Sequence, residues 1–222
     1  MFKMGLMLGK VKNVLIVVSI GCILLFGALS IGFGKLNGPI KKYYDTGKLF
    51  YETNYRDGKQ DGLFKRYYRD GQLLFEATYK NDKLQGEAKK YYENGKLEEE
   101  ITYENDKKEG PNKGYYENGQ MQYEGFLKNG KPDGVYKIYY KNGKLQEVGT
   151  YKEGQLEGAT KTYYENGQIK VEENSKDGIP EGIARRYDEN GALMGEIIFK
   201  DGQPVKMDNH DALITRTPIK GE

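Results

Sequence analysis

Side chains that commonly carry out catalysis are scarce in this chain of 222 residues. It contains no tryptophan, one cysteine and one histidine, and beyond residue 35 its only serine is Ser175. The single histidine, His210, lies close to the carboxyl end. A Ser–His–acid or Cys–His arrangement needs several of these side chains together, and a zinc site needs a cluster of Cys and His. We therefore expect a protein that is not an enzyme and holds no metal or cofactor.

An excess of charge of one sign is also missing from most of the chain. Residues 1–35 hold four of the 35 Lys and Arg residues and no acid, which leaves 31 cations against 33 anions in residues 36–222. Nucleic acid and anionic lipid surfaces are bound by strongly positive surfaces. The mixed charge of residues 36–222 therefore argues against a nucleic-acid partner.

The first 35 residues differ in composition from everything after them. Lys3, Lys10 and Lys12 precede a stretch at residues 14–34 that contains no charged side chain. A helix of this length is about long enough to cross a hydrocarbon layer of roughly 30 Å. We expect a single-pass membrane anchor with a short cytoplasmic tail and the remaining residues outside the cytoplasm, because basic tails tend to stay inside. The alternative is a cleaved signal peptide, which would leave a secreted protein.

A 24-residue unit then recurs seven times without insertion or deletion. The units span residues 38–61, 62–85, 86–109, 110–133, 134–157, 158–181 and 182–205, and residues 206–222 depart from the pattern as a cap or tail. With the opening Gly counted as position 0, position 5 is always Tyr and position 9 is always Gly. Position 6 is Tyr in six units, and position 11 is Leu, Met or Ile. Such self-similarity is the signature of a repeat architecture.

Each unit carries the signals of a β-hairpin. An Asn-Gly or Asp-Gly pair at positions 8 and 9 marks a tight turn in most units, and the apolar side chains at positions 11, 15 and 17 alternate with polar ones. A second turn is expected near positions 19 to 21. The chain is therefore predicted to be all-β: an elongated, solenoid-like array of hairpins in one curved antiparallel sheet, preceded by a transmembrane helix. The turn glycines are Gly47, Gly71, Gly95, Gly119, Gly143, Gly167 and Gly191.

Two hairpin registers fit the unit. A type I turn followed by a left-handed Gly would pair position 5 with position 11, and we favour it because position 8 varies while position 9 does not. A two-residue type I′ turn would instead set the cation at position 3 opposite the Glu that occupies position 14 in six units. Those glutamates are expected to form a ladder neutralised by neighbouring lysines. They are Glu52, Glu76, Glu100, Glu124, Glu172 and Glu196.

The favoured register separates two rows of tyrosine. Positions 5 and 11 would share the buried face and form the structural core, whereas position 6 would lie on the open face and contact a partner. The expected core residues are Tyr43, Tyr67, Tyr91, Tyr115, Tyr139, Tyr163, Tyr187, Leu49, Leu73, Leu97, Met121, Leu145, Ile169 and Leu193. The candidate partner-binding stripe is Tyr44, Tyr68, Tyr92, Tyr116, Tyr140 and Tyr164.

The pattern Tyr-Tyr-x-x-Gly-x-Leu-x-x-Glu, followed by Tyr-x-x-Gly-Lys, resembles the MORN-repeat variant over residues 38–205. The resemblance implies a β-hairpin repeat used for protein or membrane interaction, with no catalytic residues. Bacterial proteins with this repeat are often described as antitoxin components, which would imply a toxin or effector as partner. We expect a membrane-anchored scaffold that binds a protein. The alternative is a structural or adhesive module of the cell envelope that contacts glycan or membrane.

Overall fold

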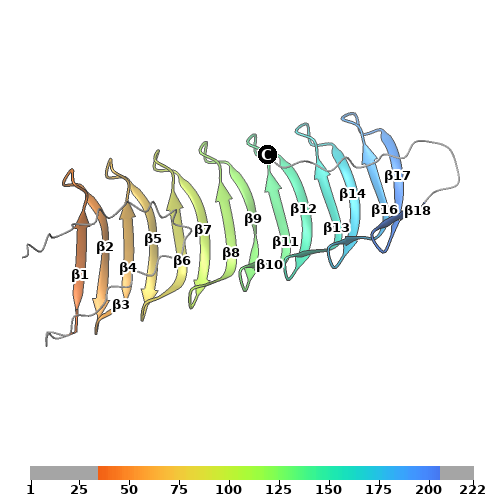
Figure 1. Cartoon of the computed structure of the whole chain (residues 1–222). Coiled ribbons are helices and arrows are strands. Elements are labelled where there is room, and N and C mark those ends of the chain that lie inside the picture. Colours follow the sequence, from red (N-terminus) through yellow and green to blue (C-terminus); the bar gives the residue numbers. More distant parts are fainter. Residues whose placement is uncertain (1–34, 206–222) are drawn as a thin grey trace, which may run out of the picture. The chain divides into compact units, whose positions relative to one another are not determined.

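The repeats form one antiparallel β-sheet. The computed structural model describes residues 35–205, which contain eighteen strands, and it assigns no helix among them (Figure 1). This confirms the all-β hairpin array. The predicted anchor at residues 14–34 and the predicted cap at residues 206–222 lie outside the described residues. Within the described part of the chain, no helix is long and apolar enough to cross a membrane.

Each hairpin has a first strand that ends at position 5 and a second that runs from position 11 to position 18. The first strands are β1 (Gly38–Tyr43), β4 (Gly62–Tyr67), β6 (Lys83–Tyr91), β8 (Lys107–Tyr115), β11 (Gly134–Tyr139), β13 (Gln155–Tyr163) and β16 (Gly182–Tyr187). The second strands are β2 (Leu49–Arg56), β5 (Leu73–Lys80), β7 (Leu97–Glu104), β9 (Met121–Lys128), β12 (Leu145–Lys152), β14 (Ile169–Lys176) and β17 (Leu193–Lys200).

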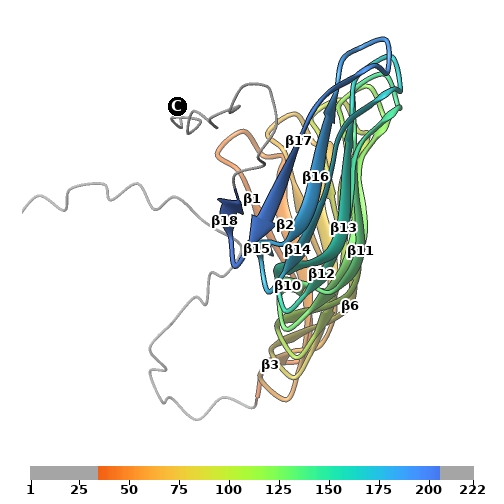
Figure 2. The same cartoon turned by 90° about the vertical axis from the view of Figure 1, so that its right-hand side faces the viewer.

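Short strands join some of the hairpins. They are β3 (Lys59–Gln60), β10 (Lys131–Pro132) and β15 (Ile179–Pro180), and a fourth short strand, β18 (Gln203–Val205), follows the last hairpin. At the remaining junctions the same segment is the beginning of β6, β8 or β13, so consecutive hairpins stay hydrogen-bonded. Viewed along the row of strands, successive hairpins superpose as a single layer (Figure 2). Both faces of the sheet are therefore open to contact over the described residues.

The first turn of the unit has the favoured geometry. In the first repeat the N–H of Tyr44 donates to the carbonyl of Lys48 at 2.8 Å, and Tyr43 lies opposite Leu49. Gly47 has a φ of 81°, in the left-handed region where only Gly is unstrained, and the other six turn glycines are likewise at positive φ. The register that pairs position 5 with position 11 is thus confirmed at the turn.

A β-bulge then restores the other pairing. Beyond Tyr43 the register shifts by one residue, so that Lys42 lies opposite Tyr51 and Lys41 opposite Glu52. The residue left without a partner is Phe50, at position 12, and the same shift occurs in every repeat. A bulge adds one residue to one strand of a pair. The two registers that the sequence left as alternatives therefore coexist in each hairpin.

The second turn is the two-residue type. Asp57 and Gly58 have φ values of 52° and 81°, as a type I′ turn requires, and Arg56 pairs with Lys59 across it. Asn129 and Gly130 repeat this geometry with φ values of 51° and 78°. The turn predicted near positions 19 to 21 is confirmed. The type I′ geometry considered for the first turn belongs to the second.

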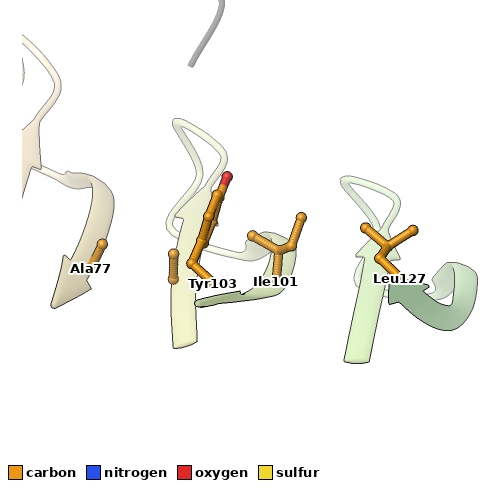
Figure 3. Close-up of a cluster of buried hydrophobic side chains, with 5 residues drawn as sticks. Ala77, Ile101, Tyr103 and Leu127 are labelled. Carbon is orange, nitrogen blue, oxygen red and sulfur yellow. The ribbon is translucent and has the colours of Figure 1, made fainter. Parts of the chain in front are cut away.

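The bulge decides which side chains share a face. Positions 3, 5, 11 and 14 lie on one side of the sheet, called here the ion-pair face. Positions 2, 4, 13, 15 and 17 lie on the other side, called here the aromatic face. The buried apolar side chains are all on the aromatic face, at positions 2, 15 and 17 (Figure 3). They are Ala77, Ala88, Ile101, Tyr103 and Leu127.

The predicted core at positions 5 and 11 is corrected by this arrangement. Tyr43 and Leu193 are 59% and 53% exposed, and the other twelve side chains are half-buried. Positions 5 and 11 pair as expected, but they share their face with the charged side chains, because the bulge keeps positions 3, 5 and 14 on one side. The half-buried residues are Tyr67, Tyr91, Tyr115, Tyr139, Tyr163, Tyr187, Leu49, Leu73, Leu97, Met121, Leu145 and Ile169.

Candidate functional site

On the ion-pair face, the position 5 tyrosines join each repeat to the one before it. The hydroxyl of Tyr67 donates a hydrogen bond of 2.7 Å to the carboxylate of Glu52, and Lys41 lies 3.3 Å from the same carboxylate. The hydrogen bond from Tyr67 lowers the pKa of Glu52, while burial and Glu52 raise the pKa of Tyr67 to about 12. The glutamate ladder is therefore neutralised from within the sheet, as expected.

One repeat breaks this ladder. Position 14 of the fifth repeat is Val148 in place of Glu, and the hydroxyl of Tyr163 has no hydrogen-bond partner in the described part of the sheet. Lys137 and Lys161, which lie opposite Val148 on the two neighbouring strands, form ion pairs with glutamates of the fourth and sixth repeats. Lys137 lies 3.0 Å from Glu124, and Lys161 lies 2.8 Å from Glu172. The chain thus contains a natural comparison between tyrosines with and without a carboxylate.

The position 6 tyrosines also hold the repeats together. The hydroxyl of Tyr44 donates to the carbonyl of Tyr67 at 2.7 Å, and the other five make the same bond to the next repeat. All six side chains are half-buried, like most of the position 5 tyrosines. The contrast between a buried row and an open row is therefore not observed. A partner contact through the exposed part of these rings stays a prediction.

The edge of the sheet away from the first turns has a third junction, which we did not predict from the sequence. The side chain at position 23 accepts a hydrogen bond from the backbone N–H at position 19 of the next repeat, as Glu109 does from Asn129 at 2.6 Å. Five such bonds occur among the described residues, and Asn37, the residue before the first repeat, accepts the equivalent bond from Asp57. The sequence does indicate this junction, because position 23 carries a side chain that can accept a hydrogen bond, Asp, Glu or Gln, in the first six repeats.

The aromatic face carries side chains that change from repeat to repeat. In the first two repeats, the ring centroid of Phe64 lies 5.9 Å from that of Tyr51 and 6.1 Å from that of Phe75. Cations accompany the rings: Arg66 lies 5.1 Å from the ring centroid of Phe50, and Lys42 lies 5.7 Å from that of Tyr51. These distances suit cation–π contacts. This end of the face is therefore aromatic and positively charged.

Farther along the same face, tyrosines are accompanied by acids. The rings of Tyr123 and Tyr136 stack with centroids 6.0 Å apart and planes 18° apart, and Tyr151 meets Tyr136 edge-on at 6.0 Å. We call these three side chains the tyrosine shelf. The hydroxyl of Tyr123 donates to Glu99 at 3.0 Å, and burial, with Glu173 nearby, raises the pKa of Glu147. Tyr151 occupies position 17, which is aromatic in five repeats and was expected to be part of the core. The other residues were not singled out from the sequence, because they occupy positions that vary between repeats.

Comparison with known families fits this geometry. A family model described as MORN repeat variant matches seven consecutive segments, at residues 36–57, 60–81, 84–105, 108–129, 132–153, 156–177 and 180–201. Together they cover more than half of the chain. The chain belongs to the MORN repeat variant family. No curated protein matches it in a sequence comparison.

The MORN repeats divide their residues between two tasks. The recurring side chains at positions 5, 6, 9 and 14 form the turns and the junctions between repeats. The varying side chains at positions 2, 4, 13 and 15 form the aromatic face and give each repeat its own surface. Over residues 35–205, no group of three or more His, Cys, Asp or Glu side chains is placed to hold a metal ion. The aromatic face is therefore the candidate site.

Proposed function

We propose that this protein is a non-enzymatic, membrane-anchored scaffold whose MORN repeats bind a protein partner through the aromatic face. The single observation that carries the proposal is the composition of that face. It presents half-buried rings such as Tyr51, Phe64 and Tyr136, and no strand or helix of the described residues lies over it (Figure 2). Aromatic side chains are enriched at the centres of protein interfaces.

The opposite face supports this choice of surface. Its carboxylates and cations already pair with one another, as Glu124 does with Lys137 and Tyr139, so a partner would have to replace contacts that exist. A ring on the aromatic face needs only to lose water on binding. Burial of apolar area is the main favourable term in most protein association.

We further propose that the partner is a toxin or effector, which would give the protein an antitoxin-like or immunity role. This step rests on the resemblance of the repeats and on the expected anchor at residues 14–34, which would hold the scaffold at a membrane with its repeats outside the cytoplasm. The partner would then act in that compartment or cross it.

Capture of the partner from detergent-solubilised membranes tests the proposal. The full chain should retain one protein in stoichiometric amount, and Phe64→Ala should reduce the amount retained. Phe126→Ala is the matched control, because Phe126 is 44% exposed on the ion-pair face. Thermal melts of both variants separate loss of binding from loss of folding. Equal capture by the two variants would place the contact elsewhere, and retention of no protein would contradict the proposal.

A second function has its own supporting observation. Each repeat is tied to the next by the same tyrosine and turn hydrogen bonds, and this regularity suits a rigid spacer or an adhesive module of the cell envelope. In that case the full chain should bind to purified cell-wall polysaccharide or lipid vesicles, and no single protein should be enriched.

A further inference from the structure

The tyrosine shelf is built on glycines. A β-carbon added to Gly114 would collide with the ring of Tyr123, and one added to Gly125 would collide with the ring of Tyr136. Both tyrosine rings therefore lie close against the backbone of a neighbouring strand. The rings of Tyr123 and Tyr136 form the flat surface of the shelf, and the ring of Tyr151, which meets Tyr136 edge-on, borders it on one side. Elsewhere on this face the corresponding positions carry side chains such as Ala77, so the arrangement belongs to the middle repeats.

Acids stand at both ends of this shelf. Across the sheet, Glu99 pairs with Gly114, Gly114 with Tyr123, Tyr123 with Ile138, and Ile138 with Glu147. No cation forms an ion pair with Glu99 or Glu147 within the described residues. Lys90 is opposite Glu99 in the register, but its Nζ lies 2.6 Å from Glu98 instead. The shelf is therefore a negatively charged aromatic surface.

Buried polar atoms around the shelf also lack partners. Asn112 is only 6% exposed and donates from its amide to the hydroxyl of Tyr136 at 3.1 Å, but its Oδ1 accepts no hydrogen bond. The hydroxyl of Tyr103 and the Oγ1 of Thr160 are likewise buried and unpartnered. Leaving a buried polar atom without a partner is costly. Because Asn Oδ1 can only accept, it calls for a ligand that carries a hydrogen-bond donor, such as an N–H group.

We propose that the tyrosine shelf binds an arginine side chain presented by the protein partner. A planar guanidinium stacks on a tyrosine ring, is attracted by its electron-rich face and supplies five N–H donors to carboxylates and amide oxygens. The stacked rings, the carboxylate of Glu99 beside Tyr123 and the acceptor of Asn112 match these three properties. Glu147 lies four strands from Glu99, ~19 Å across the sheet, and adds negative charge at the other end of the shelf. The inference rests on the proposed function, because it specifies the chemistry of the partner at this face.

Titration with a defined probe tests the inference directly. The probe is a terminally blocked peptide of alternating Arg and Gly, and calorimetry with the purified full chain measures its binding. We expect Glu99→Gln to weaken binding by roughly five- to tenfold, and Glu147→Gln, which removes a more distant charge, to weaken it less. The matched control is Glu100→Gln, the adjacent residue on the opposite face, which should bind the peptide within about twofold of the unchanged chain.

Two further probes sharpen the result. The same peptide with Lys in place of Arg should bind more weakly, because a compact ammonium does not stack as a plane, and a peptide with Glu should not bind. Tyr136→Leu, which keeps an apolar side chain but removes the ring, should weaken Arg-peptide binding. Melting curves confirm that each variant is folded. Equal loss in the Glu99→Gln and Glu100→Gln chains would indicate unspecific charge attraction and would overturn the inference.

The outcomes for the site and for the proposed function are distinguishable. Peptide titration decides whether the shelf recognises arginine, even if capture from membranes yields no protein. A partner that is retained equally well by the unchanged chain and by the Glu99→Gln chain would overturn the shelf inference, while the proposed function would stand.

Discussion

The two faces of this sheet use the same backbone for different purposes. On the ion-pair face the same contact recurs, from Tyr67 with Glu52 to Tyr187 with Glu172, and one exception follows from Val148. On the aromatic face, equivalent positions carry Tyr51, Phe75, Glu99 and other side chains in successive repeats. In a repeat array each unit contacts only its neighbours, so every junction must work alike. The comparison teaches that identity between repeats marks junctions, whereas variation marks the surface available for recognition.

Removal of a buried side chain from the aromatic face should have the largest effect on stability. Ile101 is 4% exposed, and Ile101→Ala should lower the free energy of unfolding by about 2–5 kcal/mol because a cavity remains. Ile183 lies on the ion-pair face and is 40% exposed, so Ile183→Ala should cost less than about 1 kcal/mol. Urea melts of both variants measure the difference, and equal costs would contradict the assignment of the core.

Disturbing the tyrosine shelf should have the next largest effect. Gly125→Ala introduces a β-carbon into the space of the Tyr136 ring and should cost about 1–3 kcal/mol. In a chain that already carries Tyr136→Ala, the same Gly125→Ala change should cost almost nothing, because the colliding ring is gone. A double-mutant cycle from thermal melts measures this coupling. Additive effects would show that the ring does not rest on Gly125.

The tyrosine ladder of the ion-pair face can be tested within this one chain. Tyr91→Phe removes a 2.7 Å hydrogen bond to Glu76 and should cost about 1 kcal/mol, because a carboxylate loses its donor. Tyr163 has no carboxylate opposite its hydroxyl in the described sheet, so Tyr163→Phe should be nearly neutral. Denaturant midpoints of the two variants give the comparison. A larger loss of stability in Tyr163→Phe than in Tyr91→Phe would show that the hydrogen bonds from tyrosine to glutamate do not stabilise the sheet.

The pH dependence of stability should reflect the same face and be the smallest effect. Hydrogen bonds from Tyr139 and Lys137 lower the pKa of Glu124, and the pKa values of Glu52 and Glu172 are also lowered from 4.5. A lowered folded-state pKa stabilises the protein above the unfolded value, and this stability is lost as the pH falls through the folded value. Melting temperatures should therefore decrease below about pH 4.5, and Glu124→Gln should reduce that decrease. An unchanged acid slope in this variant would contradict the assignment.

Stability should also decrease in alkali, as the tyrosines of the ion-pair face lose their protons. Burial and Glu76 raise the pKa of Tyr91 to about 12 from 10.0. A raised folded-state pKa contributes stability that is complete below the unfolded value and is lost as the pH rises towards the folded value. Stability should therefore fall between about pH 10 and pH 12, and Tyr91→Phe should make that fall shallower.

Much of the fold follows from the sequence alone because its signals are local. A recurring Gly at position 9 determined where the first turn lies, and pairs such as Asp57-Gly58 determined the second. Alternation of apolar side chains predicted strands, and the unvarying 24-residue spacing predicted an array of equal hairpins. The turns and the alternation each depend on only a few consecutive residues, so a single unit is enough to reveal them, whereas the spacing appears when the units are compared.

The tertiary structure decided what depends on contacts between repeats. The bulge at Phe50 adds one unpaired residue to the second strand. As a result, Tyr43 lies opposite Leu49 while Lys41 lies opposite Glu52. A shift of one residue reverses the face on which every later side chain lies. For that reason the sequence placed the core at positions 5 and 11, whereas the fold buries Ile101 and its neighbours. The tyrosine shelf was likewise hidden, because it forms only where glycines on one strand receive rings from the next strand in the sheet.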